Sequence, residues 1–83
     1  MTQYEIRTSM TEADQIAAGF KDFVFRNDKT LIGVGDDITF RAYKDGTPTR
    51  HRIDRLRFKV VYVDADAPIE NGFKVLGFRK IRR

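Results

Sequence analysis

The stretch from Gly19 to Phe40 constrains the fold of this chain more than any other part of its sequence. It begins at a glycine that can end a helix. It continues over Asp22–Arg26 as an alternating segment, with Phe23 and Phe25 on one face, and reaches a Gly-Asp turn at Gly35 before a second alternating segment. Alternation with a period of two is typical of β-strands that bury one face. The stretch therefore predicts the end of a helix followed by two strands.

A short helix is predicted from Met10 to Ala18, where apolar residues recur at helical spacing and give one buried stripe. Ser9 and Glu12 have the spacing of a capping box, in which the hydroxyl accepts a backbone N–H and the carboxylate returns to the cap. Gly19 can supply the left-handed residue that commonly ends a helix. Phe20 is then placed to pack back on the last turn.

The second half of the chain is predicted to form a hairpin and two further strands. Lys44–Pro48 contains Asp-Gly, one of the strongest short turn signals. The strand expected over 50–62 has a phase fault near Asp54-Arg55, where its apolar residues change from odd to even positions. A β-bulge or bend there would restore the register, since one extra residue flips every later side chain. A loop over 64–72 leads to a closing strand over 73–81.

These elements predict a small α+β, mainly β, domain: a curled or barrel-like sheet of five to six strands with one packed helix. The 83 residues are expected to form one domain, 1–83, because a chain this short builds a single core. The composition, with 41% hydrophobic and 12% aromatic residues, is that of a globular protein. There is no cysteine, which removes disulfides, thiolate zinc sites and cysteine nucleophiles. We expect neither a metal nor another cofactor.

Charge is distributed unevenly along the chain. The formal net charge is +4, but residues 1–48 carry −2 and residues 49–83 carry +6. This asymmetry favours an acidic partner for the second half, most simply a phosphate backbone, although a solubilising surface would give the same pattern. The sequence has neither a leader-like apolar segment at its start nor an apolar run of bilayer length, so we expect a cytoplasmic protein without a membrane partner.

The candidates for binding nucleic acid are the basic residues of the segment 50–59. Alternation on a strand would place Arg55, Arg57 and Lys59 on one face, with a repeat of ~6.5–7 Å that can follow a phosphate backbone. Such a row is also a common protection of a strand against edge pairing. The full candidate set is Arg50, Arg52, Arg55, Arg57 and Lys59.

The ordered set Gly19-Phe20-Lys21, Arg26 and Gly35-Asp36 resembles the ASCH-like branch of the PUA-like superfamily. The signature of that branch is a helix ending in Gly-x-Lys, a strand ending in Arg, and a Gly-Asp turn before the next strand. The resemblance covers about a quarter of the chain. It implies a cleft between the helix and the barrel, in which Lys21 gives a point charge and Arg26 a fork to one anionic or nucleoside ligand.

Two further residues complete the expected ligand site. Asp36 would orient the Arg26 fork. Most of the seven phenylalanines are expected to serve in the core, so Tyr43 is the aromatic residue that we expect to stack on a base.

Some members of the resembled superfamily are amidohydrolases of acetylated cytidine. In these enzymes the same Lys is joined by a Thr three residues later and by an acidic residue from a later helix. Here Val24 stands at the first position and offers no hydroxyl nucleophile. The loop over 64–72 is also too short to carry the acid-bearing helix, so we predict no catalytic residue.

The predicted function is non-catalytic binding of RNA or a nucleotide-like ligand through the basic strand and the helix–barrel cleft. One alternative is an amidohydrolase acting on a modified nucleoside in the same cleft. Another is a protein-interaction module, such as a phage-encoded modulator of a host enzyme, whose basic face would meet an acidic protein.

Overall fold

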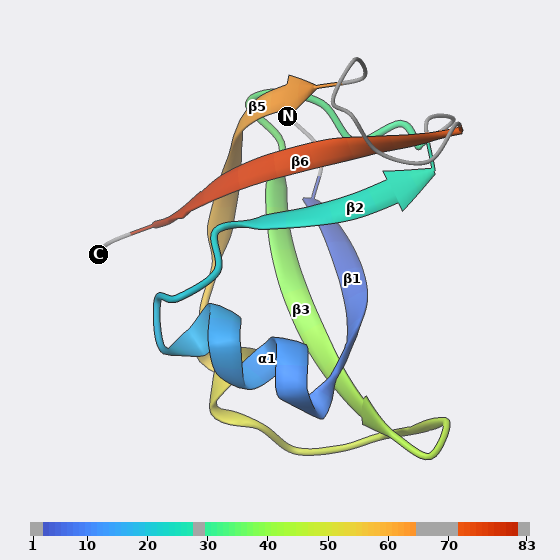
Figure 1. Cartoon of the computed structure of the whole chain (residues 1–83). Helices are drawn as coiled ribbons and strands as arrows, with labels where there is room; N and C mark the ends of the chain where they lie inside the picture. Colours follow the sequence, from blue (N-terminus) through green and yellow to red (C-terminus); the bar gives the residue numbers. More distant parts are fainter. Residues whose placement is uncertain (1–2, 28–29, 65–71, 82–83) are drawn as a thin grey trace.

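The computed structural model describes residues 3–27, 30–64 and 72–81 (Figure 1). Its elements are β1 (Gln3–Ser9), α1 (Met10–Ala17), β2 (Phe23–Asn27), β3 (Asp37–Lys44), β4 (Thr47–Pro48), the 3₁₀ helix η1 (Arg52–Arg55), β5 (Phe58–Asp64) and β6 (Phe73–Lys80). The strands form one six-stranded sheet in the order β1-β3-β5-β6-β2, with β4 paired to β3. β1 and β3 are parallel, and the other pairs are antiparallel.

The sheet is curled but stays open, with β1 and β2 as its two edges, and α1 packs beside β1 and β3 (Figure 1). The prediction of a small, mainly β fold with one packed helix is therefore confirmed. Of the loop expected over 64–72, residues 65–71 lie outside the described part of the chain. Within the described ranges, no helix has the length and the apolar character needed to cross a membrane.

Ser9 and Gly19 cap the two ends of α1 as the sequence predicts, but two details of the prediction fail. The Ser9 hydroxyl accepts a hydrogen bond from the Glu12 N–H at 3.1 Å, but the Glu12 carboxylate binds Lys21 rather than returning to the cap. Gly19 has φ +86°, and two backbone hydrogen bonds to carbonyls of the last turn complete a Schellman arrangement. The prediction that Phe20 packs back on this turn is wrong, because its side chain is 88% exposed.

The core is centred on three phenylalanine rings from three strands. Phe40, Phe58 and Phe78 are all buried, and their ring centroids lie 5.1–5.3 Å apart in tilted or edge-to-face pairs. Aromatic pairs prefer such geometries. Ala13 and Ile16 add the apolar stripe of α1 to the same cluster. The helix is thus fixed to the sheet by the face that its periodicity predicts.

In β2 the aliphatic residue faces the core and the phenylalanines face outwards. Val24 is fully buried opposite Leu76 of β6, whereas Phe25 is 47% exposed. Phe23 and Phe25 share the outer face, with ring centroids 5.8 Å apart. The expectation that most of the seven phenylalanines serve in the core is therefore wrong, because only Phe40, Phe58 and Phe78 are buried.

The segment 50–57 is not a strand, in contrast to the sequence prediction. It contains η1, and β5 begins only after it. Ile53 is fully buried and Leu56 packs against the core, so the predicted phase fault does mark a break in the strand pattern. The break is a 3₁₀ turn, while a register shift typical of a β-bulge comes later, between Val60 and Tyr62.

His51 fixes the start of η1 and ties it to α1. Its Nδ1 accepts a hydrogen bond from the Ile53 N–H at 3.0 Å, so the neutral ring carries its proton on Nε2, which lies 2.6 Å from Oδ1 of Asp14. The Asp54 carboxylate accepts a hydrogen bond from the His51 N–H at 3.2 Å, which completes a capping box. One imidazole, only 7% exposed, therefore joins two elements that are distant in the sequence.

Candidate functional site

Lys21 lies in the turn between α1 and β2 and reaches back to the helix. Its Nζ is 2.7 Å from Oε2 of Glu12, and both side chains are largely shielded from solvent. The ammonium is also 5.4 Å from the ring centroid of Phe23, within cation–π range. The Lys21 ammonium can therefore bind a ligand phosphate either by contacting Glu12 and the phosphate at the same time or by breaking its ion pair with Glu12.

Arg26 bridges the two open edges of the sheet. From β2, its Nη2 donates a hydrogen bond to the Arg7 carbonyl oxygen of β1 at 3.1 Å, and its Nη1 donates to the Phe25 carbonyl oxygen at 2.6 Å. Burial lowers the pKa of the Arg26 guanidinium below its ordinary value, and the Glu12 carboxylate opposes this effect. Arg26 thus holds the two edges together. The Glu12 carboxylate, which forms the ion pair with Lys21, also acts electrostatically on Arg26.

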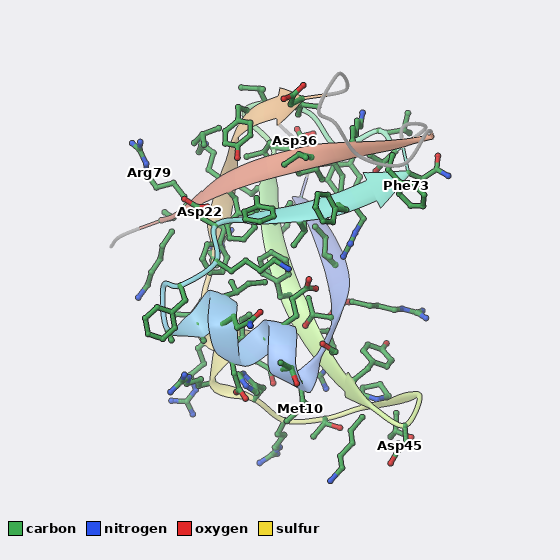
Figure 2. The ribbon with its side chains drawn as sticks, viewed as in Figure 1. Met10, Asp22, Asp36, Asp45, Phe73 and Arg79 are labelled. Carbon is green, nitrogen blue, oxygen red and sulfur yellow. The ribbon has the colours of Figure 1, made fainter. Side chains whose placement is uncertain are left out.

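Asp36 and Tyr43 lie too far apart to bind the same small ligand. Asp36 directly precedes β3 and Tyr43 comes near its end, so they are ~23 Å apart along the strand. Figure 2 shows Asp36 and Asp45, the residues that flank β3, at opposite ends of the molecule. Asp36 accepts a hydrogen bond from the Gly33 N–H at 2.8 Å, and the ring centroid of Tyr43 is 5.2 Å from the Arg7 guanidinium carbon. The four predicted ligand residues therefore do not form one site.

A hollow of about 600 Å³ opens between the C-terminal end of α1 and the strands β5 and β6. Its volume lies within the range of small-ligand sites. Phe58 and Phe78 contribute to its apolar wall. Its charged and tyrosine lining residues are Lys21, Asp22, Tyr62, Arg79 and Lys80, of which Asp22 and Arg79 are labelled in Figure 2. We call this the helix–sheet hollow; three cations and one carboxylate make it a positive site.

Tyr62 lies directly over Gly77 of β6, its partner in the strand register. A β-carbon built on Gly77 would overlap Cδ2, Cε2 and Cζ of the tyrosine ring. The missing side chain at Gly77 therefore lets the ring lie against the strand at the edge of the hollow.

Three of the four arginines predicted to bind nucleic acid line a second hollow, of about 580 Å³, beside η1. Its lining residues are Arg50, His51, Arg52, Asp54 and Arg55. These arginines are exposed, but Asp54 already lies 3.6 Å from the Arg41 guanidinium. A cationic surface therefore exists here, on a turn rather than on a strand.

The predicted row of Arg55, Arg57 and Lys59 along one strand face does not form, because Arg55 belongs to η1. Arg57 precedes β5, and its Nε is buried without a hydrogen-bond partner among the described groups. Lys59 lies on β5 with its Nζ 3.4 Å from Oδ1 of Asp37. A regular spacing along one phosphate backbone is therefore not available to these three residues.

Val24 occupies the position of the threonine in the amidohydrolases of the resembled superfamily. Its side chain is fully buried and has no hydroxyl. Strand alternation also places it on the face opposite to Phe23, the ring beside the Lys21 ammonium. Val24 therefore cannot supply a nucleophile next to Lys21.

Tyr62, Arg79 and Lys80 are candidate site residues that sequence reasoning missed. The hollow is assembled from the segments 16–22, 58–62 and 78–80, and no local motif indicates that these segments meet. One signal was present, since an isolated glycine inside an apolar strand indicates a close approach by another group. Gly77 is that glycine.

The fold and the site define a small, open, mainly β domain with a cation-lined hollow beside its helix. No protein-family model matches this chain, and no curated protein matches it. Among solved structures it is similar to the "Crystal structure of hypothetical protein PH0355", with a TM-score of 0.61 and 14% sequence identity, over 95% of this chain and 99% of that chain. At this identity the likeness shows a shared fold, and the ASCH-like resemblance stays a prediction.

Proposed function

We propose that this protein binds single-stranded RNA, or a nucleotide-like ligand, without catalysing a reaction, and that the helix–sheet hollow is its main site. The observation that carries the proposal is the convergence of three cations and a tyrosine ring on one hollow. Phosphates are bound by cations, and bases stack on aromatic rings. The hollow offers both to one ligand.

The charges of the hollow suit a ligand that arrives from solvent. Arg79 and Lys80 are exposed at the end of β6, so neither guanidinium nor ammonium has to leave a buried position. Lys21 is held in place by Glu12 and can turn its remaining hydrogen-bond donors to a phosphate. The arginine surface beside η1, at Arg50, Arg52 and Arg55, would extend the contact with a longer strand.

Binding of a labelled oligouridine over a salt series tests the proposal. If the three cations of the hollow each neutralise one phosphate, the log–log salt slope should be about −2, using ~0.7 per contact for single strands. Lys80→Ala should reduce the steepness by about 0.7. Lys44→Ala is the matched control, because Lys44 is likewise an exposed lysine at the end of a strand, and it should leave the slope unchanged.

Affinity that does not depend on salt would refute the proposal, as would the absence of binding at low salt. Equal effects of Lys80→Ala and Lys44→Ala would mean that net charge alone attracts the RNA and would also refute this location of the site.

A further inference from the structure

The outer face of β5, β6 and β2 carries a connected set of aromatic side chains. Because β6 buries Leu76 and Phe78, its alternate residues point away from the core. The register then places Tyr62, Gly77 and Phe23 in one row across the three strands, with Asp64, Val75 and Phe25 in the next. Phe73 of β6, opposite Asn27, follows in a third row. We call Phe23, Phe25, Tyr62, Phe73 and Val75 the aromatic face.

The rings of this face are accessible to solvent. Phe25 and Tyr62 are each 47% exposed and Phe73 is 40% exposed. Neighbouring apolar side chains exposed on one surface mark an interaction site more often than scattered single ones. Phe23 and Phe25 are in edge contact. The Tyr62 ring lies over Gly77, and Gly77 stands between Tyr62 and Phe23 in their row across the sheet.

Cations stand at one end of the aromatic face. The Lys21 ammonium is 5.4 Å from the Phe23 ring centroid, and Arg79 follows Gly77 in the outward row of β6. Both residues also line the helix–sheet hollow, which Tyr62 joins to the face. Figure 2 shows Arg79 and Phe73 at opposite ends of β6, and the face between them extends ~20 Å.

The charges of this region favour a polyanion over a second copy of the chain. Among the described residues, the carboxylates that border the face are those of Asp64, opposite Val75, and of Asp22, which lies at the cationic end beside Lys21 and Arg79. The formal net charge of +4 makes two copies repel each other and attracts a phosphate backbone. Partly exposed aromatic rings beside cations are the elements with which proteins bind single-stranded nucleic acids.

We propose that the aromatic face is a stacking surface for the bases of single-stranded RNA whose phosphates are held by the helix–sheet hollow. This inference rests on the proposed function and adds where the bases lie. Because every base has a π face, the surface should tolerate many sequences, and it should reject a double helix, whose bases are already stacked.

Phe25→Ala tests the stacking surface, with Phe25→Tyr as the variant that keeps a ring and Leu31→Ala as the control. Leu31 is exposed like Phe25 but lies in the connection before β3. Isothermal titration calorimetry is carried out with two probes, a short oligouridine and inorganic polyphosphate, which has charges but no bases. Loss of stacking on one ring should weaken oligouridine binding by about fivefold to about 150-fold. Polyphosphate binding should be unchanged, and Phe25→Tyr and Leu31→Ala should bind oligouridine like the parent protein.

The two proposals fail in different ways. Oligouridine affinity that is equal in Phe25→Ala and the parent overturns the stacking surface and leaves the cationic hollow in place. An equal loss for both probes in a folded variant also overturns it, because Phe25 would then act on the hollow and not on bases. A parent protein that binds neither probe overturns the proposed function itself. If Phe25→Ala fails to fold, Phe73→Ala serves as the second variant.

Discussion

Gly77 and Tyr62 should be energetically coupled: the effect of Gly77→Ala on the free energy of unfolding should depend on whether the Tyr62 ring is present. Gly77 sits within β6 opposite Tyr62, and the three heavy atoms nearest to a β-carbon built there all belong to the Tyr62 ring. Gly77→Ala should therefore move the ring off the strand. Once the ring is removed by Tyr62→Ala, the same change should no longer meet these nearest atoms.

The size of the coupling follows from how much of the ring is buried. Full burial of a large apolar side chain stabilises a protein by about 1.5–3 kcal/mol, and Tyr62 is 47% exposed, so displacing its buried half should cost about 0.8–1.6 kcal/mol. Replacing Gly by Ala at a compatible site restricts the unfolded chain and stabilises by about 0.4–1 kcal/mol. Gly77→Ala should thus be neutral to destabilising by about 1 kcal/mol in the parent, and stabilising by about 0.4–1 kcal/mol in Tyr62→Ala.

Urea unfolding of the four proteins of this cycle measures the coupling free energy directly. In thermal unfolding, 1 kcal/mol corresponds to a shift of about 4–8 °C for a domain of this size. Identical effects of Gly77→Ala with and without Tyr62 would refute the reasoning, because they would show that the ring does not rest on Gly77. Titration of the double variant with oligouridine also shows whether the aromatic face binds RNA without the Tyr62 ring.

Two other changes separate charge from structure. Glu12→Gln should raise oligouridine affinity by up to about fivefold, because the Glu12 carboxylate then no longer competes with a phosphate for Lys21, and a partly exposed ion pair of this kind is worth about 0.2–1 kcal/mol. Unchanged affinity in filter binding would place Lys21 outside the RNA contact. His51→Ala should lower the free energy of unfolding by about 1–3 kcal/mol in urea, because the Ile53 N–H loses its acceptor and Asp14 its donor, while His51→Asn should restore part of the loss as a capping residue. An alanine variant as stable as the parent would contradict this role of His51.

The sequence was most informative where a few neighbouring residues decide the conformation. Ser9 and Gly19 cap α1 as predicted, because each cap depends on hydrogen bonds within one turn of chain. Asp45-Gly46 forms the predicted turn between β3 and β4 and takes positive φ at both residues, as a tight hairpin requires. Such local decisions need no knowledge of the rest of the fold.

Prediction failed where contacts between distant segments determine the conformation or the burial of a residue. Alternation shows that Phe23 and Phe25 share a face of β2, but only the packing against β6 shows that Val24 is the buried residue. The phase fault was located correctly, but a 3₁₀ turn stands there instead of a bulge, and no spacing in the sequence reveals that His51 ties this turn to Asp14 of α1. The resemblance implied a cleft beside the helix with Lys21 in it, but Tyr62, Arg79 and Lys80 were missed for the same reason, because the lining of the helix–sheet hollow comes from three separate segments.

The exposed phenylalanines are the strongest argument that this fold has a function on its outer surface. The interior is packed with the rings of Phe40, Phe58 and Phe78, and Phe25 lies on the outer face with 47% of its surface exposed. It also lies on β2, an open edge of the sheet, where an exposed apolar side chain invites pairing with other chains. A polar residue would fill the same strand position without that risk. Since about half of this ring stays exposed in the folded protein, we expect it to contact a partner, and the Lys21 ammonium beside the adjoining Phe23 ring favours an anionic one.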